Sequence, residues 1–182
     1  MAGPAYTGST PPGEDDARMD PKHLERLQAT PIFGALREDA LAFLLAQTRM
    51  VSVRAGDWFF REGDMARGMY VLEAGRAEVL KGWRDEAMSV RTLEPGDCFG
   101  EMALMDLFPR SASIRAIDDC TAIELTPDDL LRLYEHDLEQ FTLVQMNIGR
   151  ELSRRLRLTD EQLFRARMGD RPDSGHTPFG ST

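Results

Sequence analysis

The N-terminal part of the chain has a helical pattern of hydrophobic residues. Leu24 and Leu27 follow Asp20-Pro21 at helical spacing, and further leucines recur between about residues 37 and 47. An Asp can cap a helix N-terminus, and Pro fits the first turn. The pattern therefore predicts helices within residues 20–48.

The pattern changes to that of short strands between residues 49 and 126. Apolar runs such as VSV, WFF, MYVL, AEVL and TAIEL recur at close spacing, with Gly-containing turns between them. Gly supplies the positive φ that tight turns need, and Asp bonds its own backbone there. Many short strands with regular turn signals predict an antiparallel β-roll or jelly roll.

Helical spacing returns after the strands, over residues 127–168. Thr126 is a candidate N-cap for a first helix, and a longer helix is predicted from 137 to about 167. An apolar seam that resembles a coiled coil, interrupted by Gln145, predicts a homodimer through helix 137–167. This seam consists of Leu138, Phe141, Ile148 and Leu152.

The predicted fold class is therefore α+β: a β-roll flanked by N-terminal helices and a long C-terminal helix, in one domain over 20–168. Residues 1–19 and 169–182 are rich in Gly, Pro and polar residues and are expected to be disordered.

Charge and composition narrow the class of partner. The 182 residues include 31 acidic and 22 basic side chains, a net charge of −9, which disfavours nucleic acid as a partner. No apolar run approaches the ~18 residues of a membrane span, and no signal peptide is visible, so no membrane contact and a cytoplasmic location are expected. Cys98 and Cys120 lie in apolar contexts typical of small buried residues.

Enzymatic chemistry has little support in the sequence. The three histidines, His23, His136 and His176, all lie outside the strand region. A metal site inside a β-barrel needs several His from the strands, and Ser/His or Cys/His catalysis needs a His nearby. We therefore expect neither a metal nor an enzyme.

The segment Phe99–Ala116 carries the strongest chemical signal. Arg110 and Ser111 could bind phosphate oxygens, and the amides of residues 100–103 could bind an anion if a helix begins there. An ionised Glu101 only accepts hydrogen bonds, so a sugar hydroxyl is its natural partner. An exposed Glu101–Arg110 ion pair on an ordinary loop is the alternative, and spacing alone leaves both possibilities open.

The residues around this segment resemble a known family. Phe99-Gly100-Glu101, followed by Ala-Leu and then by Pro-Arg, together with YVLEAGRAEV upstream, is similar to the phosphate-binding cassette of the cyclic nucleotide-binding domain family. The resemblance implies that Glu101 holds the ribose 2′-OH and that Arg110 holds the cyclic phosphate, assisted by Ser111 and nearby amides. The implied ligand-binding residues of this segment are Gly100, Glu101, Met102, Ala103, Arg110, Ser111 and Ala112.

The stretch SRRLRLTDEQL over 153–163 is similar to the long helix of the bacterial cyclic-AMP receptor branch of the family. This similarity implies that Arg155 lies near the ribose glutamate and that Thr159 contacts the base. Asp160 departs from the family pattern, which has a serine from the partner subunit at that position.

The expected function is a stand-alone cyclic nucleotide sensor that signals to an unknown effector protein by changing shape. Only about 14 residues follow Met168, too few for a DNA-binding head. Cyclic AMP is the first candidate ligand, because Ser111 matches the cyclic-AMP receptor branch, although its hydroxyl also fits cyclic GMP. Cyclic di-GMP is a further candidate because RxxD patterns occur at Arg61–Asp64 and Arg167–Asp170, and a scaffold with a degenerate site is the last alternative.

Overall fold

The computed structural model describes residues 20–83, 86–106 and 108–169, so the segments 1–19 and 170–182 lie outside the described residues. The helices are α2 (Pro21–Gln28), α3 (Glu38–Gln47), α4 (Met102–Asp106), α5 (Pro127–His136) and α6 (Leu138–Gly169). The strands are β1 (Arg49–Val53), β2 (Trp58–Phe60), β3 (Met69–Ala74), β4 (Ala77–Trp83), β5 (Glu86–Leu93), β6 (Cys98–Phe99), β7 (Ser113–Ala116) and β8 (Cys120–Leu125).

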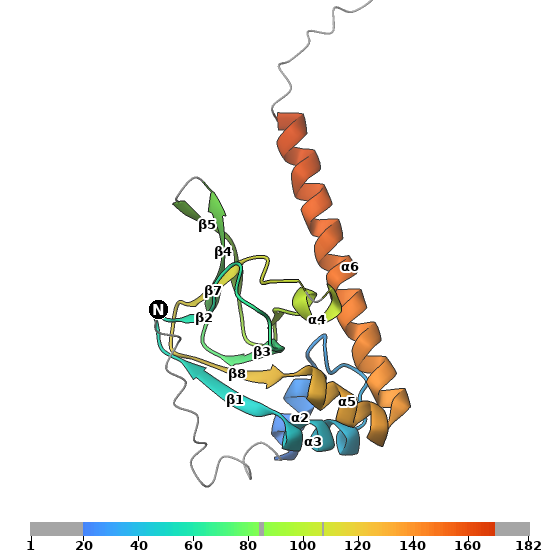
Figure 1. The fold of residues 1–182 in the computed structure, drawn as a ribbon. Helices are drawn as coiled ribbons and strands as arrows, with labels where there is room; N and C mark the ends of the chain where they lie inside the picture. Colours follow the sequence, from blue (N-terminus) through green and yellow to red (C-terminus); the bar gives the residue numbers. More distant parts are fainter. Residues whose placement is uncertain (1–19, 84–85, 107, 170–182) are drawn as a thin grey trace, which may run out of the picture.

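The strands form two four-stranded antiparallel sheets. Their orders are β1-β8-β3-β6 and β2-β7-β4-β5, so strands distant in sequence become neighbours, as in a roll. Figure 1 shows the helices α2, α3 and α5 below the strands and α6 rising along one side. The α+β fold class predicted from the sequence is confirmed.

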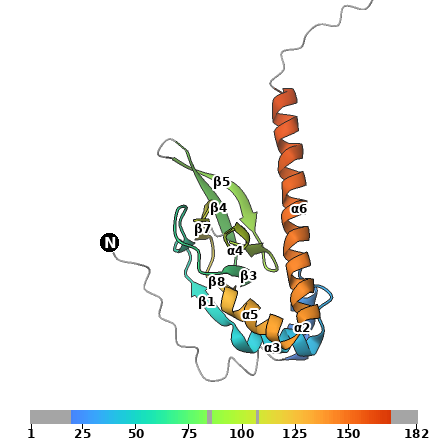
Figure 2. The same cartoon turned by 45° about the vertical axis from the view of Figure 1, so that its right-hand side comes forward.

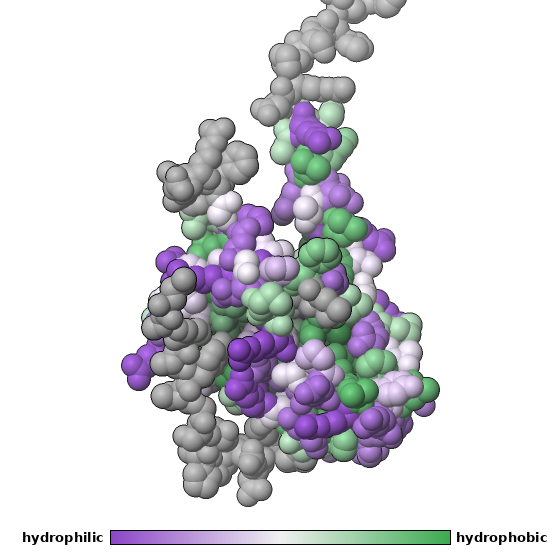
Figure 3. All heavy atoms as spheres, in the orientation of Figure 1, coloured by the Kyte–Doolittle hydropathy of each residue, from purple (hydrophilic) through white to green (hydrophobic). Residues whose placement is uncertain are grey.

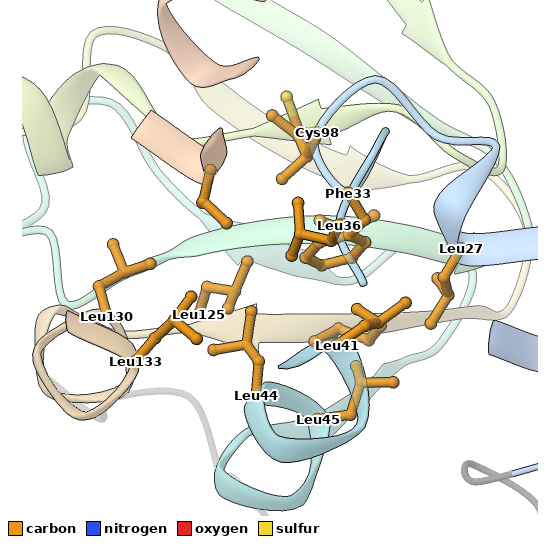
Figure 4. Packing of buried hydrophobic residues seen from close by; sticks show 14 of the residues in the cluster. Leu27, Phe33, Leu36, Leu41, Leu44, Leu45, Cys98, Leu125, Leu130 and Leu133 are labelled. Carbon is orange, nitrogen blue, oxygen red and sulfur yellow. The ribbon is translucent and has the colours of Figure 1, made fainter. Parts of the chain in front are cut away.

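Two hydrophobic clusters hold this arrangement together, and they share the sheet that contains β3. Tyr70 and Leu72 point into the roll, whereas Met69 and Val71 pack with the helices, so β3 is buried on both faces. Figure 4 shows leucines of α3 and α5 gathered around Leu125 and Phe33. The hydrophobic cluster of the helices therefore packs against the sheet that contains β3 and supports the roll from outside.

Capping side chains mark the helix starts that the sequence predicted. The Asp20 carboxylate accepts the Lys22 amide at the start of α2. Thr126 accepts the Asp129 amide at 3.2 Å, while the Asp129 carboxylate accepts the Thr126 amide, which is a capping box.

Helix α6 is docked on the domain by its first half and projects beyond it by its second half. The Asn147 amide donates to the carbonyls of Ile32 and Gly34, and Ile148 is fully buried. Figure 2 shows the second half of α6 standing clear of the β4–β5 hairpin. Ile148 therefore belongs to the core of its own chain, and the seam suggested by the sequence is wrong at this position.

Within the described ranges, none of the helices combines the length and the apolar character that crossing a membrane requires.

Candidate functional site

The site begins where β6 ends and α4 starts. Gly100 follows β6 with φ +78°, a conformation that L side chains rarely adopt, and the chain then turns into α4 at Met102. Glu101 lies between them and is only 3% exposed. A short helix therefore does begin at the segment where the sequence suggested an anion-binding set of amides.

Arg110 is buried against the same turn. Its Nη1 donates to the Gly100 carbonyl at 3.0 Å, and its Nη2 donates to the Gly68 carbonyl at 2.7 Å. The guanidinium carbon lies 4.0 Å from the centroid of the Phe60 ring, a cation–π distance. With 4% exposure, Arg110 does not form the surface ion pair with Glu101 that was the alternative reading of the spacing.

Glu101 instead pairs with Arg155 of α6. Arg155 Nη1 donates to Glu101 Oε1 at 2.6 Å, although 54 positions separate the two residues in sequence. The Nη2 of Arg155 also donates to the Cys98 carbonyl, and its Nε donates to Glu151 at 2.8 Å. This ion pair joins the long helix to the turn between β6 and α4.

Burial and charge act in opposite directions on the groups of this cluster. Burial lowers the pKa of Arg155, but the carboxylates of Glu101 and Glu151 outweigh it, so that its pKa is raised and the guanidinium stays charged. Burial raises the pKa of the Cys98 thiol to about 12, so the thiol stays protonated at neutral pH. Both cysteines are free and buried, as their sequence context indicated.

The remaining sequence-predicted residues lie around this centre with different exposure. Met102 and Ala103 form the first turn of α4, and the exposed Ser111 hydroxyl lies 3.7 Å from the Met102 sulfur. Ala112 is half-buried beside it. Thr159 lies one turn beyond Arg155, is exposed, and donates to the Arg155 carbonyl. The structure thus brings the cassette and Arg155 together, whereas Thr159 faces solvent.

A lysine on β4 braces the loop that carries Arg110 and Ser111. Lys81 Nζ donates to the Ser111 carbonyl at 2.5 Å and to the Glu62 carboxylate at 2.5 Å. The Arg110 carbonyl also accepts the Gly63 amide. These contacts tie the loop to the β2–β3 turn.

The same turn contains the first RxxD pattern. The Asp64 carboxylate accepts the Arg61 amide at 2.8 Å, and the Arg61 guanidinium lies over the Trp58 ring. The pattern therefore builds a tight turn. In the described part of the chain, no cluster of three or more His, Cys, Asp or Glu side chains is arranged to hold a metal ion.

An apolar hollow of about 420 Å³ adjoins the cassette between α4, α5 and α6. Hydrophobic surface gathers there in Figure 3. Glu101 and Arg110 are not among its lining residues, which are Leu104, Met105, Pro127, Leu130, Leu131, Tyr134, Phe141, Gln145 and Ile148.

Sequence reasoning missed several residues that shape the site. The Gly68 carbonyl and the Phe60 ring hold Arg110, and they come from segments with no local signal for that role. Glu151 is 3% exposed and pairs with Arg155. Its spacing, four residues before an arginine on a predicted helix, was a signal that could have identified it.

Comparison with known proteins identifies the family that this sequence resembles. Residues 50–137 match the cyclic nucleotide-binding domain. A cyclic AMP receptor protein from Thermus thermophilus is 29% identical over 140 residues, which cover 75% of this chain and 62% of that protein. A cAMP-dependent protein kinase regulatory subunit from Emericella nidulans is 33% identical over 107 residues, 59% of this chain but only 26% of that protein.

Solved structures give the same result. The catabolite activator protein of Thermus thermophilus matches with a TM-score of 0.66 and 29% identity, over 74% of this chain and 62% of the other. A cyclic nucleotide-binding domain from Methylobacillus flagellatus matches in fold, with a TM-score of 0.71 and 21% identity over 79% and 81% of the two chains. With its β-roll, its cassette and these relatives, this chain belongs to the cyclic nucleotide-binding domain family.

Proposed function

We propose that the domain is a cyclic AMP sensor without catalytic activity of its own, which signals to a partner protein through a change of conformation. The observation that carries the proposal is the joint burial of Glu101, which follows Gly100 in the chain, and Arg110, which donates to the Gly100 carbonyl. A guanidinium suits the cyclic phosphate and a carboxylate suits the ribose hydroxyl.

Two observations favour cyclic AMP over other cyclic nucleotides. Ser111 follows the cassette arginine, as in the cyclic-AMP receptor branch, and the relatives from Thermus thermophilus and Emericella nidulans are named for cyclic AMP. Cyclic GMP is the second candidate, because the exposed Ser111 hydroxyl could also serve a guanine. We assign the base contact to Thr159, whose exposed position on α6 suits a ligand held between the roll and the helix.

The test is a calorimetric titration with cyclic AMP, cyclic GMP and cyclic di-GMP. We expect cyclic AMP to bind most tightly, and Arg110→Ala to lose about 1.5–3 kcal/mol of binding free energy, the range for a hydrogen bond to a charged group. Arg157→Ala is the matched control, because Arg157 is an exposed arginine of α6. Tighter binding of cyclic GMP or cyclic di-GMP would make that nucleotide the assigned ligand. If none of the three nucleotides binds, the result favours a scaffold with a degenerate site.

We also propose that two copies associate through the projecting half of α6. Leu156 and Leu163 are seven residues apart on one helix face, and both are exposed. Phe164 extends the same apolar surface. Light scattering should give about twice the 20.5 kDa of one chain, and Leu163→Ser should weaken the dimer. Leu158→Ser, on the opposite side of the helix, is the control; a monomer at all concentrations would exclude this dimer.

A further inference from the structure

Glu151 is a buried carboxylate that the proposed ligand contacts leave unexplained. It lies on α6 with 3% exposure, and an ionised group at such a position is costly unless charged partners surround it. Arg154 is one such partner and donates two hydrogen bonds, from Nε at 2.9 Å and from Nη2 at 2.7 Å. Arg155 is the second partner and donates a third hydrogen bond, from Nε at 2.8 Å.

The charge state of Glu151 follows from these contacts. Burial by itself would raise its pKa, but the hydrogen bond from Arg154 and the charge of Arg155 lower the pKa below its ordinary value. Glu151 is therefore ionised at neutral pH. Two buried carboxylates, Glu101 and Glu151, are balanced by the two arginines.

The plane of the Arg155 guanidinium is fixed by three different acceptors. Its Nε donates to Glu151, its Nη1 to Glu101 at 2.6 Å, and its Nη2 to the Cys98 carbonyl. A guanidinium is rigid and planar, so the direction of Nε determines where both Nη groups point. Glu151 therefore sets the direction from which Arg155 meets Glu101.

Glu101 has little freedom once this contact is made. Its Oε1 accepts from Arg155, and the carboxylate can accept further hydrogen bonds only along its remaining lone pairs. A sugar hydroxyl must approach along one of those directions. The recognition of the hydroxyl thus depends on the carboxylate rotamer that Arg155 holds.

We propose that Glu151 is a positioning residue for sugar recognition, which orients Arg155 and through it the Glu101 carboxylate, so that discrimination for the ribose 2′-hydroxyl depends on Glu151. The inference rests on the proposed function, because it presumes a cyclic nucleotide at Glu101. Glu151 itself touches no ligand in this scheme.

The test compares cyclic AMP with 2′-deoxy cyclic AMP in calorimetric titrations of the full chain. Wild-type protein should bind cyclic AMP more tightly than the deoxy compound. Glu151→Gln keeps the size of the side chain but removes its charge. It should weaken cyclic AMP binding about tenfold, the lower end of the effect of a hydrogen bond to a charged group, and leave the deoxy affinity within about twofold. A merely structural role would lower both affinities alike.

Glu161→Gln is the matched control, because Glu161 pairs with Arg165 four residues later on the exposed part of the same helix. It should leave both affinities unchanged. If Glu151→Gln does not fold, Glu151→Asp, which keeps the charge on a shorter side chain, should show the same selective loss. Unchanged cyclic AMP binding, or an equal loss for both ligands, overturns the inference. A wild-type protein that binds neither cyclic AMP nor cyclic GMP refutes the proposed function instead.

Discussion

Replacing Gly100 with alanine tests whether Arg110 is held where the structure has it. A Cβ at this position would lie 2.5 Å from Arg110 Nη1, closer than real contacts allow. The Arg110 side chain cannot move away without cost, because Nη1 and Nη2 are bonded to two carbonyls and the guanidinium lies over Phe60. The substitution must therefore displace the guanidinium or the turn.

Two separate costs add up in this variant. An L residue in the left-handed region at φ +78° costs about 1–2 kcal/mol. Loss of the bond from Arg110 to the Gly100 carbonyl costs a further ~1.5–3 kcal/mol, the range for a charged donor. Gly100→Ala should therefore lower the free energy of unfolding by about 2.5–5 kcal/mol, a large part of the ~5–15 kcal/mol of a typical domain.

Gly56→Ala separates the two costs. Gly56 has a similar φ of +86°, but nothing lies within 4 Å of its added Cβ, so it should lose only the backbone cost of about 1–2 kcal/mol. Urea unfolding followed by circular dichroism gives both values. If the two variants lose equal stability, within about 0.5 kcal/mol, the Arg110 contact with Gly100 contributes nothing and the reasoning fails.

Three further predictions concern other parts of the molecule. Because Cys98 and Cys120 are buried, and burial raises the pKa of Cys98 to about 12, a thiol reagent at pH 8 should label the urea-unfolded chain at both and the native chain at neither; rapid native labelling would contradict this. Thr126→Ala should lower the free energy of unfolding by about 1 kcal/mol through loss of the α5 cap. Thr142→Ala, which removes an exposed hydroxyl from the second turn of α6 and no cap, should cost little by the same measurement. The pKa of Glu151 is lowered on folding, so the stabilisation that its ionised carboxylate provides is complete above the ordinary value of 4.5 and is lost as the pH falls through the lower folded value. Below pH 4.5, the free energy of unfolding of the wild-type protein should therefore fall more steeply than that of Glu151→Gln, and parallel curves for the two proteins would contradict this prediction.

Features encoded by neighbouring residues could be predicted from the sequence. Asp20 and Thr126 cap their helices because the capping groups and the amides they accept lie within three residues. The positive φ of Gly56, Gly63 and Gly96 follows from the turn chemistry around each of them. The phosphate-binding cassette could also be identified from the sequence, because its pattern occupies one short segment.

Features that depend on how distant elements dock could not be predicted. Helical periodicity identifies an apolar face of α6, but it does not say whether Ile148 packs in its own core or on a second copy. The partners of Arg110 lie 42 and 10 positions away, and the family resemblance, not the spacing of residues in the chain, placed Arg155 near Glu101. Such contacts are set by sheet register and helix position, which no local pattern records.

The pairing of Glu101 with Arg155 limits how the domain can respond to a ligand. A ligand shifts a conformational equilibrium only by its difference in affinity for the two states. If α6 has two positions and a sugar hydroxyl bonds Glu101 equally well in both, the ligand does not shift the equilibrium between them, however tightly it binds. One hydrogen bond to a carboxylate is worth about 1.5–3 kcal/mol, which matches the usual coupling of 1–3 kcal/mol between sites. The hydrogen bond to Glu101 is therefore strong enough to shift this equilibrium, provided that the ion pair with Arg155 holds the Glu101 carboxylate in only one of the two positions of α6.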